Sequence, residues 1–258
     1  MIPKIIHHTW KTTEIPQKWQ HTVTSCKNTY HKYQYILWTD QQMYTFVRTQ
    51  FPHIYSAWIH YPYHIQRCDA FRYMVLYTYG GIYMDLDVGC KAFPVLDSLV
   101  SGNNLIIAES SNSSVVMNTC YTNSFLASSQ YNTFMKKCIE HLPLCKHHGR
   151  FFGKHMNIML STGPLFLTNM YKKHSPDNLF ILKKADYSGN CTVCNSSSCT
   201  GGKFFFETTG NSWHSFDSTA LNWLYCNIIK LYSVAIVLIL MILIIFNKNK
   251  LKRFHFSY

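Results

Sequence analysis

The chain has 258 residues, of which 47% are apolar and 16% aromatic, and its formal net charge is +12. That length suits one domain of ordinary size with room for an appendage, and the apolar content is enough for a core. The charge indicates an anionic partner, but Lys and Arg are scattered and no aromatic–basic repeat typical of RNA-binding proteins occurs. Composition therefore favours phosphate-bearing small molecules or a membrane surface over nucleic acid.

Strands and helices are predicted to alternate along most of the chain. "KIIHHTW" and "YQYILWTD" are β-rich, "QQMYTFVRTQF" is helical, and a longer helix over 66–79 ends at Gly80-Gly81. "IYMDLDV" and "NLIIAES" are predicted strands, and "NTFMKKCIEHL" is a predicted helix. Gly163-Pro164 breaks a strand or starts a helix, and "GKFFFET" is the last strand. This order predicts an α/β domain with a largely parallel sheet.

The segment "YTYGGIYMDLDVGC" places two carboxylates, Asp85 and Asp87, one residue apart in a chain with only twelve acidic residues. If the segment is one strand, alternation puts both aspartates on the same face as Tyr83. Their Cα atoms would then lie roughly 6.5–7 Å apart. The intervening apolar side chains would pack on the opposite face.

Two more charged residues precede this strand. Asp69 and Arg72 are spaced i, i+3 on the predicted helix, so they share a face. The double glycine allows a sharp turn, and open α/β sheets bind ligands at the carboxyl ends of their strands. Residue types alone leave three interpretations open. They are a Mg²⁺ or Mn²⁺ site, a glycosidase acid–base pair, for which neighbouring positions on one strand are poorly arranged, and a solvated strand end with a surface ion pair.

A long apolar segment lies near the C-terminus. Leu231–Phe246 contains no charge, and it lies between Lys230 and the basic tail "NKNKLKRFHF". A helix needs about 20 residues to cross a hydrocarbon core about 30 Å thick, and Trp223 and Tyr225 suit the interface. The predicted organisation is a globular domain at 1–225, a transmembrane helix at 226–247 and a short basic tail at 248–258.

The membrane orientation stays open. The basic tail favours a cytosolic C-terminus by the positive-inside rule. The N-terminus "MIPKIIHHTW" has no hydrophobic signal-peptide region, which favours a cytosolic N-terminal domain instead.

The ten cysteines also leave two interpretations. Cys191, Cys194 and Cys199 cluster in "CTVCNSSSC", but a structural zinc site needs four ligands and no second pair lies at a usual spacing. Disulfides in an oxidising compartment fit equally well. Three potential N-glycosylation acceptors would be relevant only in a secretory lumen: Asn112, Asn190 and Asn195.

Five segments resemble glycosyltransferase family 32, which includes catalytic subunits of fungal mannosyl phosphorylinositol ceramide synthases and bacterial capsular polysaccharide transferases. In chain order they are "IPKIIHHTWKTTEIPQKW", "YILWTD", "RCDAFRYMVLYTYGGIYMDLDVGC", "STGPLFLT" and "GNSWHSFD". The resemblance implies a GT-A fold, that is, a Rossmann-like α/β domain for a nucleotide diphosphate sugar. One stretch departs from the family: after "TNSFLAS" this chain reads "SQYNTF" instead of a Pro-Gly-His-Pro-like sequence, which concerns acceptor-side contacts.

The resemblance also implies roles for individual residues. The implied catalytic set is Asp85, Asp87 and Arg72, with the two aspartates as the DxD motif. The implied metal ligands, for Mn²⁺ or Mg²⁺, are Asp85, Asp87 and His214. The implied donor-binding residues are Thr9, Trp10, Asp69, Arg72, Tyr83 and Trp213.

The implied activity is retaining, metal-dependent transfer of a hexose from a nucleotide diphosphate sugar to a lipid or glycan hydroxyl. Mannose from GDP-mannose is the first choice and a UDP-sugar the second, and an inositol phosphoceramide is a suitable acceptor. The expected location is a single-pass protein of the Golgi or the endoplasmic reticulum in a eukaryotic host cell. The alternative is a catalytically inactive, membrane-anchored protein that binds sugar nucleotides or carbohydrate. No nucleic-acid partner is expected.

Overall fold

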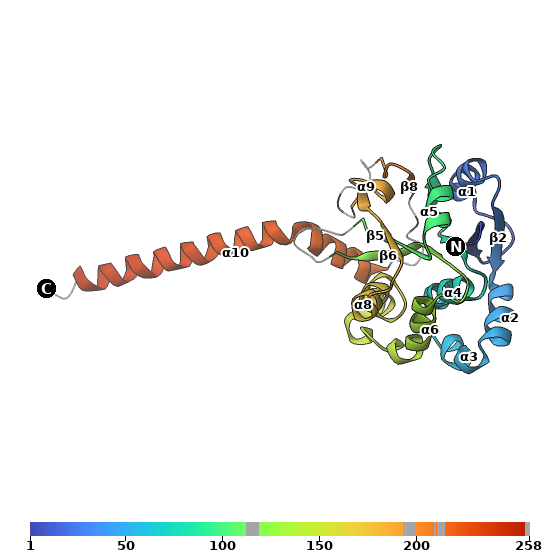
Figure 1. Cartoon of the computed structure of the whole chain (residues 1–258). Coiled ribbons are helices and arrows are strands. Elements are labelled where there is room, and N and C mark those ends of the chain that lie inside the picture. Colours follow the sequence, from blue (N-terminus) through green and yellow to red (C-terminus); the bar gives the residue numbers. More distant parts are fainter. Residues whose placement is uncertain (112–118, 193, 195–199, 209, 211–214, 256–258) are drawn as a thin grey trace. The chain divides into compact units, whose positions relative to one another are not determined.

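The computed structural model describes residues 1–111, 119–192, 194, 200–208, 210 and 215–255, with side chains as far as residue 244. The chain divides into two compact units, Met1–Ser215 and Phe216–Tyr258 (Figure 1). Both sheets belong to the first unit.

A six-stranded mixed sheet forms the centre of the first unit, in the order β2-β1-β3-β6-β5-β7. Its strands are β1 (Ile5–Trp10), β2 (Gln34–Thr39), β3 (Gly81–Met84), β5 (Leu105–Glu109), β6 (Tyr121–Ser128) and β7 (Leu179–Leu182). β1 pairs in parallel with β2 and β3, and β5 pairs in parallel with β7, whereas β6 runs antiparallel to both of its neighbours. The predicted α/β class is therefore confirmed, with a sheet that is rich in parallel pairings but not purely parallel.

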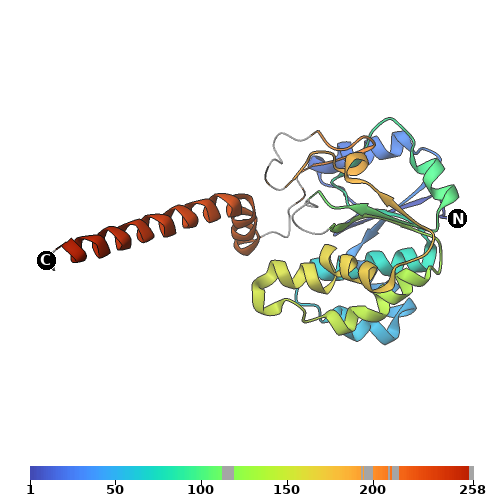
Figure 2. The ribbon, with the colours of Figure 1, turned by 60° about the vertical axis from the view of Figure 1, so that its left-hand side comes forward.

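Helices cover both faces of this sheet, as Figure 2 shows. The helices of the first unit are α1 (Gln17–Thr29), α2 (Asp40–Gln50), α3 (Pro52–Ile59), α4 (His64–Tyr79), α5 (Leu96–Gly102), α6 (Thr133–Cys145), α7 (Gly153–Ser161), α8 (Pro164–His174), α9 (Lys184–Tyr187) and the 3₁₀ turn η1 (Arg150–Phe152). Alternation along the strands builds a core on each face: Tyr83, Leu126 and Ile107 pack on one side. Their neighbours Ile82, Phe125 and Ile106 pack on the other.

Helix α4 carries the charged residues that the sequence singled out, and its central part is buried on every side. It ends at Gly80 (φ +65°) and Gly81 (φ +99°), both in the left-handed region. A Cβ atom at Gly80 would come within 2.7 Å of the Gln130 amide nitrogen, so glycine alone fits without displacement. This turn delivers the chain directly from α4 into β3.

The segment predicted as one strand is interrupted at the two aspartates. β3 ends at Met84, Asp85–Asp87 form a turn closed by a Val88 amide to Asp85 carbonyl bond of 3.1 Å, and β4 (Val88–Cys90) begins a second sheet. There it pairs antiparallel with β8 (Phe205–Glu207). Alternation therefore does not explain how the aspartates come together. Leu86 instead turns away and packs with Trp19 of α1, and a turn sets the directions of both carboxylates.

The second unit is one helix, α10 (Phe216–His255). Its segment Phe216–Ile244 is long and apolar enough to cross a membrane, and none of its most apolar stretch is buried. The helix thus begins before residue 226. The crossing segment 226–247 and the tail 248–258 remain predictions.

Candidate active site

Asp69 and Arg72 form a buried ion pair beneath the end of β3. Arg72 Nη2 lies 2.7 Å from Asp69 Oδ1, and the two side chains are 2% and 4% exposed. Asp69 also accepts hydrogen bonds from Asn123 Nδ2 (3.0 Å) and Thr162 Oγ1 (3.1 Å). Burial raises the pKa of Asp69 to about 6, while Arg72 acts in the opposite direction. Asp69 thus has a counter-ion and two hydrogen-bond donors within the protein, and it needs no bound cation to balance its charge.

Arg72 connects this pair to the first aspartate of the turn. Its Nη1 lies 3.3 Å from Asp85 Oδ1 and also donates to the Asn123 carbonyl. Its guanidinium stacks 4.5 Å from the centre of the Tyr83 ring. The Tyr83 hydroxyl donates to Asp85 Oδ1 (3.1 Å) and lies 2.8 Å from Thr9 Oγ1 at the end of β1. Asp85 is thereby held by Arg72 of α4 and Tyr83 of β3, and Thr9 of β1 holds the Tyr83 hydroxyl in turn.

Asp87 has different surroundings. Its carbonyl accepts from the Thr208 amide (2.9 Å), which attaches the turn to the end of β8. Burial, followed by the charges of Asp85 and Glu207, raises the pKa of Asp87 to about 8. Gly210 lies directly against its carboxylate, because an added Cβ there would overlap Asp87 Oδ2. Asp87 therefore lies near two other carboxylates, those of Asp85 and Glu207. Such a group of acidic side chains is suited to binding a positive ligand.

Glu207 is a third carboxylate that sequence reasoning missed. The β4–β8 pairing sets it opposite Val88, next to the turn. Its Oε1 accepts hydrogen bonds from Tyr187 Oη (2.8 Å) and Ser124 Oγ (3.3 Å), and burial raises its pKa. One signal was available in the sequence, since "FFFE" ends an apolar strand on an acid just as the segment before Asp85 does. Asn123, in contrast, had no distinguishing pattern.

The remaining predicted donor-binding residues lie partly inside and partly outside the described structure. Thr9 and Trp10 end β1 on the side of Tyr83, and Trp10 packs edge-on against Trp19 at 5.1 Å between ring centres. Both are partly exposed. Trp213 and His214 lie outside the described residues, so their predicted roles stay predictions.

The donor set of the turn fits a hard divalent cation. Carboxylate oxygens are the ligands that Mg²⁺ and Mn²⁺ prefer, and Mg²⁺ often uses one or two carboxylates together with substrate phosphates. Within the described part of the chain, no three His, Cys, Asp or Glu side chains are arranged to hold a metal by themselves. Asp85 and Asp87 are therefore consistent with a shared site that a diphosphate completes.

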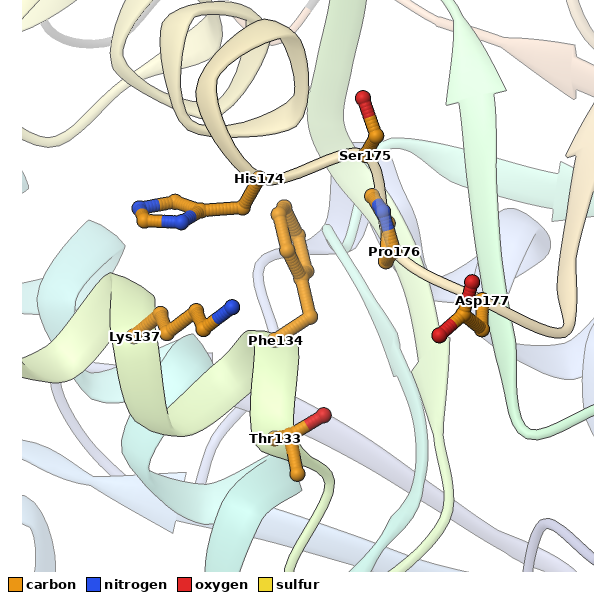
Figure 3. Close-up of a pocket in the computed structure, with 7 residues that line it drawn as sticks. All are labelled: Thr133, Phe134, Lys137, His174, Ser175, Pro176 and Asp177. Atoms are coloured by element: carbon orange, nitrogen blue, oxygen red, sulfur yellow. The ribbon is translucent and has the colours of Figure 1, made fainter.

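The cavity in Figure 3 is separate from this acidic site. Thr133 and Lys137 of α6 line it together with His174 and Asp177 at the end of α8 and beyond, and Phe134 lies between them. Its volume is about 60 Å³, whereas small-molecule sites usually measure about 300–1,000 Å³. It is too small for a sugar nucleotide.

Disulfides settle part of the cysteine question. Cys26 of α1 is bonded to Cys90 of β4, which fastens the strand after the aspartate turn to α1. Cys191 and Cys194 are also disulfide-bonded, so their thiolates are not zinc ligands. Cys199 lies outside the described residues.

The part of the sequence that contains the aspartate turn is similar to known proteins. Residues 16–111 match the glycosyltransferase sugar-binding region containing the DXD motif. Inositol phosphoceramide mannosyltransferase 1 of Schizosaccharomyces pombe is 34% identical over 86% of this chain and 66% of its own length. Mannosyl phosphorylinositol ceramide synthase SUR1 of Saccharomyces cerevisiae is 34% identical over 89% of this chain and 56% of its own length. This chain thus spans less than two thirds of either relative.

Among solved structures, the PaToxG glycosyltransferase superposes with a TM-score of 0.47 at 18% identity, covering 67% of this chain and 70% of that one. This value is too low to support an inference about the site. The sequence matches are stronger, and they include the aspartate turn and the helix that supports it. The chain belongs to the glycosyltransferases whose sugar-binding region contains the DXD motif.

Proposed function

We propose that this protein is a metal-dependent glycosyltransferase that moves a hexose from a nucleotide diphosphate sugar to a lipid hydroxyl. The observation that carries this proposal is the turn at the carboxyl end of β3, where Arg72 and Tyr83 hold Asp85 while Asp87 faces other carboxylates. The names of the relatives favour mannose as the sugar and an inositol phosphoceramide as the acceptor. GDP-mannose is therefore the first donor to test and UDP-sugars the second.

Asp85 and Asp87 would hold Mn²⁺ or Mg²⁺, which when bound supplies positive charge beside the departing nucleoside diphosphate. Arg72 is too deeply buried for direct contact with a donor in this structure, so we give it a positioning role. It neutralises Asp69 and fixes the direction of Asp85. Tyr83, which is equally buried, orients Asp85 through its hydroxyl.

Thr9 and Trp10 are partly exposed at the end of β1, and Trp10 offers a ring on which the donor base can stack. We propose two contacts from the C-terminal loop: Trp213 would lie against the diphosphate, and His214 would be a further metal ligand. These complete a donor site whose acidic side is formed by the aspartate turn.

We propose retention of the donor's anomeric configuration by a front-face mechanism. Double displacement would require a carboxylate nucleophile on the opposite face of the sugar, and the sequence offers no convincing one. Proton NMR of the first product formed tests retention itself, because an inverted anomer would exclude both of these retaining mechanisms.

We propose that the catalytic unit lies in an oxidising lumen, either the endoplasmic reticulum or the Golgi. Cys26 is bonded to Cys90, and Cys191 and Cys194 are also disulfide-bonded. Disulfide bonds are rare in cytosolic proteins. The basic tail at 248–258 would then be cytosolic, after a membrane crossing at 226–247. Protease protection of a tagged N-terminus in sealed microsomes tests this arrangement, since digestion without detergent would contradict it.

A panel of sugar nucleotides tests the activity. The full chain in lipid nanodiscs is assayed for donor hydrolysis with Mn²⁺, with Mg²⁺ and with a chelator, beside Asp87→Asn. We expect metal-dependent hydrolysis of GDP-mannose that falls on the order of 100-fold in the variant. Equal activity of both proteins would exclude the metal assignment. Tight binding of a sugar nucleotide without turnover on any acceptor would instead indicate an inactive binding protein.

A further inference from the structure

A segment with exposed apolar side chains, called the tip below, connects α6 to α7 and lies in the yellow-green part of the chain in Figure 1. We define the tip as residues 144–154. Its three large apolar side chains are among the most exposed in the first unit: Leu144 is 72%, Phe151 88% and Phe152 73% exposed. Single exposed apolar residues are common on protein surfaces. Two adjacent phenyl rings that are this exposed instead indicate a surface that binds a partner.

The tip is also uniformly basic. Lys146, Arg150 and Lys154 lie within it, and no Asp or Glu occurs from 141 to 176. Among the described residues none of the three cations forms an ion pair, and the Arg150 guanidinium lies 5.0 Å from the centre of the Phe151 ring. Lys154 Nζ lies 5.7 Å from the centre of the Tyr63 ring. Aromatic rings flanked by cations that have no acidic partner match the boundary between acyl chains and anionic headgroups.

Two glycines and a buried asparagine hold the backbone of the tip in a fixed conformation. Gly149 (φ +72°) and Gly153 (φ +92°) flank the 3₁₀ turn, and a Cβ at Gly149 would come 2.5 Å from the Met156 carbonyl. Below the turn, the buried Asn157 donates from Nδ2 to the His148 carbonyl (2.7 Å). Its Oδ1 accepts from Gln66 Nε2 (3.1 Å) on α4. The phenyl rings are therefore presented by a fixed turn fastened to the helix that carries Asp69 and Arg72.

We propose that this tip inserts into the surface of a phospholipid bilayer that contains anionic headgroups. Two observations favour a bilayer over a protein partner. The chain carries a helix suited to cross a membrane, which would keep a bilayer at high effective concentration near the first unit. The cations have no acidic partners on the tip itself, and each basic residue near an anionic surface adds attraction over about a Debye length, roughly 8–10 Å.

One helix connects the tip to the buried ion pair beneath the acidic site. Helix α7 leads from the tip to Thr162, whose hydroxyl donates to Asp69. Nine helical residues span about 13 Å. A bilayer that accepts the tip would thus lie within reach of the site for a lipid-borne headgroup. This consequence, unlike the insertion itself, rests on the proposed function.

Photo-crosslinking tests the insertion without requiring any enzymatic activity. The full chain is placed in nanodiscs of phosphatidylcholine bearing a diazirine in one acyl chain, with or without phosphatidylinositol, and adducts are mapped by mass spectrometry. We expect adducts on α10, which serves as the internal control, and on the peptide that contains Phe151 and Phe152. The tip adducts should increase when phosphatidylinositol is present. Labelling of α10 alone would overturn the proposal, and a tip protected by a second copy of the chain without lipid adducts would do the same.

Matched variants locate the effect. Phe151→Ser with Phe152→Ser should reduce tip adducts roughly tenfold, because most of the inserted apolar surface is gone. Phe93→Ser with Tyr131→Ser removes two rings that are 62% and 63% exposed elsewhere, and should leave the adducts unchanged. Replacing the three tip cations by Ser should abolish the response to phosphatidylinositol. Tip adducts that survive both sets of changes would contradict insertion.

A second readout separates insertion from catalysis. In the variant lacking both phenylalanines, transfer to a bilayer-embedded glycolipid should fall roughly tenfold while donor hydrolysis stays at the wild-type rate. If the wild type shows no transferase activity but the tip adducts are present, the proposed function fails and the insertion stands. If transfer to the embedded acceptor is unaffected by loss of the rings, the tip does not serve the acceptor.

Discussion

Asp69 on α4 and Asp87 in the turn before β4 are two carboxylates with opposite surroundings. Asp69 is buried against Arg72 and also accepts hydrogen bonds from Asn123 and Thr162. Asp87 is partly buried beside other carboxylates, and its pKa is raised to about 8. A carboxylate whose partners all come from the chain stabilises the fold, whereas one surrounded by like charge costs stability until a cation binds. The first belongs to the scaffold and the second is suited to a ligand.

The largest expected effect separates these two residues by stability. Asp69→Asn leaves the buried Arg72 without its closest anion, and we expect a loss of about 3–5 kcal/mol in the free energy of unfolding. Asp87→Asn relieves repulsion, so its stability should equal or exceed that of the wild type. Urea denaturation of both variants measures the difference. Equal losses in the two would contradict the contrast.

Loss of the disulfide between α1 and β4 should destabilise the strands next to Asp87 and leave helix α4, which carries Asp69, unaffected. Replacing Cys26 and Cys90 by Ala opens a link between residues 64 positions apart, and we expect a loss of about 2–4 kcal/mol. Because β4 follows the aspartate turn directly, hydrogen exchange should become faster in β4 and β8 while α4 keeps its protection. Uniformly faster exchange would show that the bond stabilises the whole unit equally.

Gly210→Ala tests whether the position of Asp87 is critical for activity. The new methyl group would overlap the Asp87 carboxylate, so we expect metal-dependent donor hydrolysis to fall roughly tenfold, about 1.4 kcal/mol, with little change in stability. Gly102→Ala is the control, because an added Cβ there meets nothing within 4 Å. A tenfold loss in both variants would remove Gly210 from the site.

The sequence predicted β1, β2, α2, β5, α6 and the end of α4, because glycine and periodicity are local signals, but it did not predict α1 or the central strand β6. It also placed Asp69, Arg72 and Asp85 together correctly, since i, i+3 spacing and a tight turn act over short distances. It could not predict the interruption at Asp85–Asp87. That break depends on Leu86 packing against α1 and on the pairing of β4 with β8, which is more than a hundred positions away. Glu207 was missed for the same reason.

Two buried histidines of strand β1 differ in the same way, because one has hydrogen-bond partners for both ring nitrogens and the other for only one. His7 uses both ring nitrogens when neutral: Nε2 donates to the Gly80 carbonyl (2.9 Å), and Nδ1 accepts from Trp38 Nε1 (3.2 Å). His8 donates from Nδ1 to the Met84 carbonyl (2.8 Å), while its buried Nε2 has no partner among the described residues. Burial lowers the pKa of each to about 4, although the backbone hydrogen bonds oppose it.

The smallest expected effect is the pH dependence that these histidines confer. Their pKa in the folded state lies below the unfolded value of about 6.5, so the stabilisation is complete above that value and is lost as the pH falls toward 4. At about pH 5.5 each histidine should cost roughly 1 kcal/mol. The raised pKa of Asp87 acts in the opposite direction, so the effect is measured as a difference between proteins. In His8→Asn, whose amide can still donate to Met84, the loss of stability between about pH 7 and 5.5 should shrink by roughly 1 kcal/mol relative to the wild type. An unchanged difference would show that His8 is protonated in the folded protein as readily as in the unfolded chain.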